Sequence, residues 1–574
     1  MNNRHFQWQA GMALCGLLPL AALSDNGSEQ AALAPVMIET TRLSRALDDT
    51  PLAVTRVERS DIGSGQPQLQ LAESLARVPG LYFQNSHNFA QGQRISARGF
   101  GARAPFGIRG LRIIYDGIPE TLPDGQSQVD ALDLDSAASI NVIRGPASVQ
   151  YGNASGGVID VRSVDGRTAG YRGQVRGEAG EYGYRKLNAQ LAGEQEPFYH
   201  QVSLTELDYD GYRQQSAVRQ RRLNASVGMA LTDQRALTFQ VNALETDTAQ
   251  DPGGLTRQQV RDNRRQAVAN AINLDAGQTV RQQRISLRYD DTALLGGQLS
   301  GYTFFTRREF EQQLPFPGSS LVSFDRNFYG AGIDFTRPWE LFGLHHRYVM
   351  GADIARQEDD RLRRNVNPAG AVTGISGDEL QTGTSAGLFL QSDSSLTDTL
   401  TLTLGARADR VRLAIDDRLI SDGDDSGSRT FDEYSYSAGL LWSLHADHQV
   451  YANVGTAFET HTFTEFANPD GSGGFNPDIT PQQTRSAEIG ARGLLAPRWR
   501  YDLALFGLLD WYRDVPAIPP EILFLPSTFY INIYDMSSWS RAILVPLCII
   551  YSAKPVHRHQ RVTSLRELEP DGQE

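Results

Sequence analysis

Apolar and polar residues alternate along most of the chain from Arg172 onward. In one typical stretch, Leu400, Leu402 and Leu404 alternate with threonines. Successive side chains of a β-strand point to opposite faces of a sheet, so this period predicts strands with one apolar and one polar face. Polar segments separate these stretches from one another. The pattern therefore predicts a long series of antiparallel strands.

Two architectures are compatible with such strands. A soluble β-sandwich buries its apolar face, whereas a membrane barrel turns that face toward lipid. Long strands, short turns alternating with long polar loops, and aromatic residues near strand ends favour the barrel. These aromatic residues are Tyr434, Tyr436, Trp442 and Tyr451. We therefore expect a mainly β fold with a transmembrane antiparallel β-barrel over residues 164–510, and keep the soluble sandwich as the alternative.

Residues 49–163 differ from this pattern. The segment "LAVTRVERSDI" is typical of a strand and a turn, and "LRIIYDGIP" is typical of a strand. Between them, "LAESLARVPG" predicts a short helix that ends at Pro79 and Gly80. We expect a small α/β domain here, in front of the barrel.

The N-terminus carries an apolar segment, "AGMALCGLLPLAAL", at residues 10–23. It is too short to span a bilayer but has the length of the apolar region of a secretory signal. The sequence predicts a signal peptide over residues 1–24, and therefore export. A polar tail follows over residues 25–48.

Composition narrows the classes of function. The net charge of −13 and the pI of about 5.4 argue against a nucleic-acid partner, which would require a basic face. The two cysteines, Cys15 and Cys548, cannot form a disulfide framework. The histidines form no metal-binding or triad-like motif. We expect neither enzymatic activity nor a metal site, and the sequence indicates no cofactor.

Four short segments resemble a known domain in both their order and their spacing. They are "LAESLARVPGL", "RISARGFGAR", "IIYDGIP" and "VIRGPASVQYGNASGGVIDV". Together they are similar to the plug domain of TonB-dependent outer-membrane receptors. The resemblance implies a plug over residues 49–163 inside the barrel lumen, where glycines allow backbone to pass close to backbone. These glycines are Gly145, Gly152, Gly156 and Gly157.

The resemblance continues into the barrel through "GTAFETHTFTEFANPDGSGGFNPDITPQQTRSAEIGAR". It implies import of a scarce ligand, such as a ferric siderophore or a polycarboxylate, into the periplasm. It also implies contact with outer-membrane lipid and with the TonB energy-coupling protein. The segment "APVMIETTR" takes the place of the TonB box and could bind TonB as an added strand, with a simple linker as the alternative. The box residues are Val36, Met37, Ile38, Glu39, Thr40 and Thr41.

The resemblance also implies site residues. It suggests ion pairs between the plug residues Arg98 and Arg144 and the barrel residues Glu459 and Glu488. Removing one partner of a buried pair costs on the order of 3–5 kcal/mol. The alternative is four separately solvated groups in a wet lumen.

The segment "RGFGARAPFGIRGLRIIYDGIPETLPDGQSQ" resembles a subgroup of receptors for pyrroloquinoline quinone and ferric dicitrate. Both ligands carry carboxylates, which the planar fork of arginine binds well. The implied ligand-binding residues are Arg103, Arg109, Gln126 and Gln128. The expected ligand is therefore a small anion or an iron chelate.

Residues 511–574 lose the alternation. They contain five closely spaced prolines, which are excluded from central strands: Pro516, Pro519, Pro520, Pro526 and Pro546. Barrels of the family that the sequence resembles have 22 strands, whereas residues 170–510 have room for about 14 to 16. We expect the last part of the barrel to be missing or frameshifted. A truncated, non-transporting remnant of a receptor is thus the alternative function.

Overall fold

A computed structural model of the protein describes residues 37–38, 45–46, 49–104, 106–341, 343–445, 447–467, 474–496 and 499–508. The predicted signal peptide, four of the six TonB-box residues (Val36, Glu39, Thr40 and Thr41) and the segment 511–574 lie outside these residues. The other two box residues form the strand β1 (Met37–Ile38), which pairs antiparallel with β2 (Arg45–Ala46).

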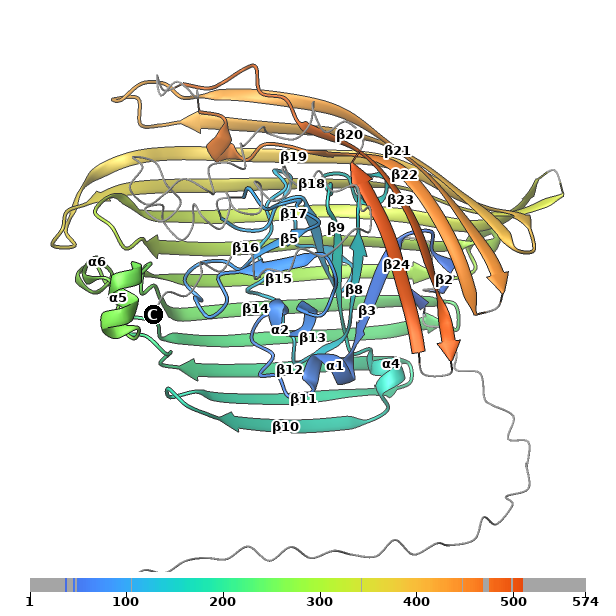
Figure 1. Cartoon of the computed structure of the whole chain (residues 1–574), viewed down its shortest axis with the longest axis horizontal. Helices are drawn as coiled ribbons and strands as arrows, with labels where there is room; N and C mark the ends of the chain where they lie inside the picture. Colours follow the sequence, from blue (N-terminus) through green and yellow to red (C-terminus); the bar gives the residue numbers. More distant parts are fainter. Residues whose placement is uncertain are drawn as a thin grey trace, which may run out of the picture. The chain divides into compact units, whose positions relative to one another are not determined.

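The predicted series of strands forms one 15-stranded antiparallel sheet, in which each strand pairs with its neighbours in sequence (Figure 1). Its strands are β10 (Arg172–Ala179), β11 (Arg185–Gln195), β12 (Phe198–Tyr209), β13 (Val218–Thr232), β14 (Arg235–Gln250), β15 (Gly277–Asp291), β16 (Gln298–Gln313), β17 (Gly318–Leu341), β18 (Leu344–Val366), β19 (Val372–Thr397), β20 (Leu400–Asp417), β21 (Gly427–His445), β22 (His448–Glu459), β23 (Gln482–Ala496) and β24 (Trp499–Leu508). Within the described residues, β10 and β24 each pair on one side only.

The two faces of this sheet distinguish a membrane barrel from a sandwich. On β20, the side chain of Leu404 lies outside and is 49% exposed, whereas its polar neighbour Thr403 is 8% exposed and donates a hydrogen bond to Asp393. Large apolar residues on other strands, such as Ile354 and Leu388, are also exposed. An apolar exterior around a polar interior is the pattern of a transmembrane β-barrel.

The aromatic residues expected near strand ends divide into two groups. Tyr434, Tyr436 and Trp442 are exposed on the outer face. Tyr451 differs from the prediction, because its side chain is only 1% exposed and points to the polar interior. There its hydroxyl donates a hydrogen bond to Glu488 over 2.8 Å. Proximity to a strand end could not reveal which face a single aromatic residue occupies.

The N-terminal α/β domain lies against the inner face of the large sheet (Figure 1). Its five-stranded sheet has the order β3-β8-β9-β6-β7, and β4 pairs with β5. The strands are β3 (Ala53–Glu58), β4 (Leu81–Gln84), β5 (Arg94–Ala97), β6 (Leu111–Tyr115), β7 (Ile118–Pro119), β8 (Ala137–Arg144) and β9 (Gly157–Ser163). The helices are α1 (Arg59–Gly63), α2 (Leu71–Leu75), α3 (Ser148–Tyr151) and α4 (Gly166–Ala169).

Local sequence explains several of these elements. The helix expected in "LAESLARVPG" is α2, whose first turn is closed by a capping box between Gln70 and Glu73. The turn expected after β3 is instead the short helix α1. Gly157 has a φ of +134°, and a side chain there would collide with the carbonyl oxygen of Ile143 on the paired strand. This position requires glycine because β8 and β9 approach closely.

The long loop between β14 and β15 carries two helices, α5 (Arg257–Asn263) and α6 (Ala269–Asn273). Two short 3-10 helices follow later in the chain, η2 (Leu294–Gly296) and η3 (Phe463–Glu465). Among the described residues, no helix is long and apolar enough to cross a membrane.

Candidate ligand-binding cavity and plug contacts

A cavity of about 2350 Å³ lies between the plug and the inner face of the large sheet. Plug loops at residues 85–93 and 126–132 form one side of it, and strands β13 and β15 to β18 form the other. Residues of α5 and of the loop before it also line the cavity. Its volume is sufficient for a metabolite-sized ligand or a metal chelate.

The charged residues of the lining are mainly cationic. Eight arginines and two aspartates contribute: Arg213, Arg222, Arg257, Arg264, Arg308, Arg326, Arg361, Arg363, Asp130 and Asp251. Asp130 already accepts a hydrogen bond from Arg308 over 2.7 Å, and Asp251 accepts one from Gln91 over 2.7 Å. The cavity is thus positive although the whole chain has a net charge of −13.

Arginines and aromatic rings alternate on one wall of the cavity. Phe310 on β16 and Phe324 on β17 are paired residues whose rings stack with centroids 4.7 Å apart. The guanidinium of Arg326 lies 4.6 Å from the Phe324 ring centroid, and that of Arg361 lies 6.0 Å from it. Such a wall offers stacking and bidentate hydrogen bonds to the same ligand.

Among the described residues, the arginines of the cavity lining differ in whether they form an ion pair. Arg326 forms an ion pair with Asp359, with 2.7 Å between Nε and Oδ1. In contrast, Arg361 and Arg363 form neither a hydrogen bond nor an ion pair with any of the described residues. Both belong to β18 and face the interior, so they are available to bind an anion.

The four residues expected to bind ligand occupy two places. Gln126 and Gln128 line the cavity, whereas Arg103 and Arg109 do not belong to its lining. Arg109 is buried, and its Nη1 donates to Oε2 of Glu465 over 2.7 Å. This placement differs from the expectation, because the Arg109 guanidinium is occupied by Glu465 of η3 and by the carbonyl oxygen of Thr460, which follows β22.

Two titratable groups near this place have shifted pKa values. Burial acts to raise the pKa of Glu465, but Arg109 and the amide of Thr462 outweigh it, so this pKa lies below its ordinary value. Burial raises the pKa of Asp124 to about 6, although Arg326 and the amide of Gln126 act in the opposite direction. Asp124 is the plug carboxyl next to Gln126, and its charge therefore depends on pH in the physiological range.

The four residues expected to form ion pairs are only partly brought together. Arg98 and Glu488 form a largely buried ion pair. Arg144 instead donates to the carbonyl oxygen of Pro79 over 3.2 Å. Glu459 accepts a hydrogen bond from Ser155 over 3.0 Å and lies 3.4 Å from Nη2 of Arg109. Plug arginines and barrel glutamates thus meet in the lumen. Arg98 pairs with Glu488 as expected, whereas the plug arginine beside Glu459 is Arg109.

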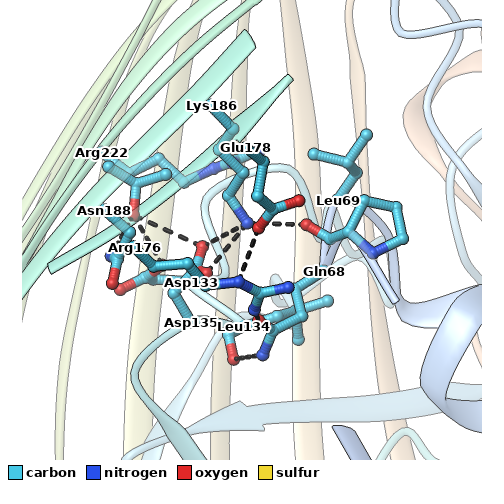
Figure 2. A network of polar contacts seen from close by, with 12 residues as sticks. Gln68, Leu69, Asp133, Leu134, Asp135, Arg176, Glu178, Lys186, Asn188 and Arg222 are labelled. Atoms are coloured by element: carbon cyan, nitrogen blue, oxygen red, sulfur yellow. Dashed lines mark hydrogen bonds and ion pairs between the residues drawn. The ribbon is translucent and has the colours of Figure 1, made fainter. Parts of the chain in front are cut away.

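A second group of plug contacts was not anticipated from the sequence. Figure 2 shows Lys186 on β11 pointing toward the plug loops that contain Gln68 and Asp135. Lys186 donates to the Pro67 carbonyl oxygen and to the Asp135 carboxylate, with N–O distances of 2.7 and 2.9 Å. Lys186 is one of only two lysines in the chain, and this rarity is the one feature of the sequence that could have drawn attention to it.

Further barrel arginines also hold the plug. Arg284 on β15 forms an ion pair with Glu120, and Arg222 on β13 donates to the Asp130 carbonyl oxygen over 3.2 Å. No group of three or more histidine, cysteine, aspartate or glutamate side chains suited to a metal ion occurs in the described part of the chain.

Two family descriptions match the parts of the chain described so far. Residues 46–158 match the family "TonB-dependent Receptor Plug Domain". Residues 222–533, which are 312 of the 574 residues, match "TonB dependent receptor-like, beta-barrel".

A third family, "Squalene-hopene cyclase N-terminal domain", matches residues 499–574. The squalene–hopene cyclase of Zymomonas mobilis is 38% identical over 98 residues, or 17% of this chain and 15% of that protein. The five prolines that depart from the barrel pattern lie within this match.

Curated relatives also include transport proteins. The vitamin B12 transporter BtuB of Vibrio vulnificus is 23% identical over 508 residues, covering 85% of this chain and 72% of that protein. The hemin receptor of Yersinia pestis is 27% identical over 194 residues, which cover 31% of this chain and 28% of that receptor. This chain therefore spans only a minor part of the cyclase and of the hemin receptor.

Solved structures share the fold. The ferric citrate transporter FecA in its unliganded form has a TM-score of 0.69 at 18% identity, covering 82% of this chain and 72% of that chain. BauA, the ferric preacinetobactin receptor from Acinetobacter baumannii, has a TM-score of 0.67 at 14% identity and covers 82% and 73%. At these identities the likeness establishes the architecture of a plug inside a barrel and nothing about the ligand.

Proposed function

Because this chain belongs to the family of TonB-dependent receptors, we propose that it imports a small anionic ligand across the outer membrane into the periplasm. The ligand is a polycarboxylate, taken up bare or as an iron chelate. Energy reaches the receptor through TonB, which binds the box at residues 36–41. The family is one of transport receptors and not of enzymes, and the cyclase similarity covers only a short part of that enzyme.

One observation above all supports the proposal that the ligand is an anion. Arg361 and Arg363 face a positive cavity and lack hydrogen bonds and ion pairs within the described residues, beside the stacked rings of Phe310 and Phe324. Cations that are largely removed from water without a partner are unfavourable, and a bound carboxylate would supply the missing hydrogen bonds. Gln126 and Gln128 lie on the plug side of the same cavity and would donate to the ligand from there.

The names of the relatives differ in their ligands, which include hemin, vitamin B12 and ferric citrate. The eight lining arginines favour a ligand with several carboxylates over a neutral one. Ferric citrate and pyrroloquinoline quinone both fit this description and serve as probes.

Binding to the full chain in detergent tests the proposal by calorimetric titration with each probe. We expect the double variant Arg361→Ala/Arg363→Ala to weaken binding by at least about tenfold, the effect of one or two lost charged hydrogen bonds. Arg364→Ala is the matched control, because Arg364 follows on the same strand and pairs with Glu311 outside the cavity lining. Absence of binding by both probes, or equal binding by the double variant, would contradict the proposal.

A second candidate function is a receptor remnant that is exported but does not transport. The observation that favours it is the pair of sheet edges at β10 and β24, which have one partner each within the described residues. Uptake of a probe that binds separates the two candidates, because a remnant with an intact cavity would bind ligand without importing it.

A further inference from the structure

The first residues of the plug, directly before β3, are bound to the barrel wall through their backbone. The carbonyl oxygens of Thr50 and Leu52 accept hydrogen bonds from the guanidinium of Arg492, the second over 3.3 Å. Between them, the Pro51 carbonyl oxygen accepts one from the Asn453 side chain over 3.0 Å. Two barrel side chains on β22 and β23 thus bind three consecutive plug carbonyls.

The wall is also shaped to receive this segment. At Gly439 on β21, an added Cβ would lie 2.9 Å from Cγ of Pro51, so the absence of a side chain there makes room for the proline ring. Pro51 has no N–H group and cannot pair as an ordinary strand residue. The carbonyl oxygens of residues 50–52 therefore take part in fixing this segment, and Arg492 and Asn453 are their donors.

Arg492 is well placed to act as a rigid donor. Its residue is 1% exposed, and its guanidinium lies 4.9 Å from the ring centroid of Tyr451. A planar guanidinium loses little freedom when it donates to two acceptors, and hydrogen bonds from a charged donor are stronger than neutral ones.

The same barrel residues connect this contact to a second plug segment. The Tyr451 hydroxyl donates to Oε1 of Glu488 over 2.8 Å, and the other oxygen of Glu488 pairs with Arg98. Arg98 in turn donates to the Arg144 carbonyl oxygen, at the end of β8 that pairs with Ala53 of β3. Arg492, Tyr451, Glu488 and Arg98 therefore form one continuous chain of contacts around the start of β3.

We propose that Arg492 and Asn453 are positioning residues that hold residues 50–52 on the barrel wall, so that a pull on the N-terminal tail must release this contact before it reaches β3. The tail upstream of Thr50 contains β1, which holds two residues of the TonB box. The proposal rests on family membership and not on the identity of the ligand, so its test needs no ligand.

Amide hydrogen exchange of the full chain in detergent tests it, since exchange reports local opening. In Arg492→Met we expect the amides of residues 53–58 to exchange at least about tenfold faster, because two charge-assisted hydrogen bonds are lost. Asn453→Ala should give a smaller acceleration of the same amides, and serves if Arg492→Met does not fold. The amides of β9, residues 157–161, should keep their rates in both variants.

Arg485→Met is the matched control, because Arg485 is an exposed arginine on the same strand β23. Unchanged exchange at residues 53–58 in both test variants would overturn the proposal. Equal acceleration at residues 157–161 would also overturn it, because the two residues would then stabilise the whole plug and not its N-terminal segment.

The continuity of the contacts is tested by Tyr451→Phe, which keeps the ring beside Arg492 but removes the hydroxyl donor to Glu488. We expect the amides of residues 53–58 to exchange faster in Tyr451→Phe. In the double variant with Arg492→Met, the increase in exchange rate should be smaller than the product of the increases in the two single variants. Independent effects would separate Arg98 and Glu488 from the contact at residues 50–52 and overturn this part of the proposal.

Discussion

Lys186 of the barrel and Asp135 of the plug form a buried ion pair, with 2.7 Å between Nζ and Oδ2 and side chains that are 1% and 2% exposed. Lys186 also donates to the Pro67 carbonyl oxygen, so a single barrel side chain holds two plug loops. Burial raises the pKa of Asp135, and Lys186 partly offsets this effect. The pair thus stabilises docking of the plug only while both partners are present.

We predict that Lys186→Met weakens the plug, because it leaves a buried carboxylate without its cation, at a cost of about 3–5 kcal/mol. The measurement is the urea midpoint for loss of amide protection in β6, residues 111–115. The double variant Lys186→Met/Asp135→Leu should recover much of the loss, because two apolar groups can replace a buried pair. Arg185→Met is an exposed neighbouring control, and a Lys186→Met midpoint equal to that of this control would refute the prediction.

The pKa of Asp124, raised to about 6 by burial, predicts a dependence of stability on pH. The folded chain binds the proton more tightly than the unfolded chain, so stability falls as pH rises from the ordinary aspartate pKa near 3.8 through 6. The full effect, present above pH 6, is about 3 kcal/mol at most.

Replacing Asp124 by asparagine should remove this dependence, because the amide stays neutral and can still accept the hydrogen bond from the Gln126 backbone. We expect Asp124→Asn to melt at a higher temperature than the parent chain at pH 7.5 and at nearly the same temperature at pH 4. Asp61→Asn, at a plug position whose side chain is 47% exposed, is the control. A constant difference between the two pH values would show that Asp124 does not titrate in this range.

The TonB-box hypothesis predicts that Ile38→Pro abolishes binding of the periplasmic domain of TonB. Proline removes the N–H group that an added strand would use, whereas Ile38→Val keeps it. Surface plasmon resonance with the purified full chain should show loss of TonB binding for the proline variant and little change for the valine variant. Equal binding by both variants would support the alternative that residues 36–41 are a simple linker.

The sequence predicted the strands well because their alternation is local. Leu404 and Thr403 are neighbours whose opposite faces follow from the period of two alone, and their exposures confirm the barrel interpretation. Similarly, the plug segments were identified by short glycine-containing motifs. The partner of a charged residue is not local information: Arg109 pairs with Glu465, which lies 356 positions later in the 3-10 helix η3. The hydrophobic pattern along the sequence contains no information about such a contact. The resemblance indicated only that arginines of the plug and glutamates of the barrel meet in the lumen.

The residues that line the cavity could be predicted only in part, for a related reason. Gln126 and Gln128 could be assigned to a plug loop, and they line the cavity. Arg361 and Arg363 belong to a strand in which arginines alternate faces: Arg364 pairs outside with Glu311, and its neighbour Arg363 points inward. Composition cannot tell these two arginines apart. Only the register of β17 and β18 places Arg361 beside Phe324.

The two edges of the large sheet determine whether the chain can insert into a bilayer as a closed barrel. β10 and β24 have one partner each among the described residues, and no pairing closes the sheet there. In hydrocarbon, each unpaired N–H or C=O group costs several kcal/mol, so an open edge of this length is strongly unfavourable in a bilayer. The remnant candidate therefore predicts that the chain, expressed as written, is exported but does not insert as a closed barrel. It should lack a heat-modifiable band on semi-native gels and be degraded in the periplasm.

The matched control replaces residues 509–574 by the corresponding barrel end of a TonB-dependent relative, which supplies partners for both edges and should restore the heat-modifiable band. A stable, heat-modifiable species formed by the unaltered chain in the outer membrane would show that the edges are closed, and would favour the transporter over the remnant.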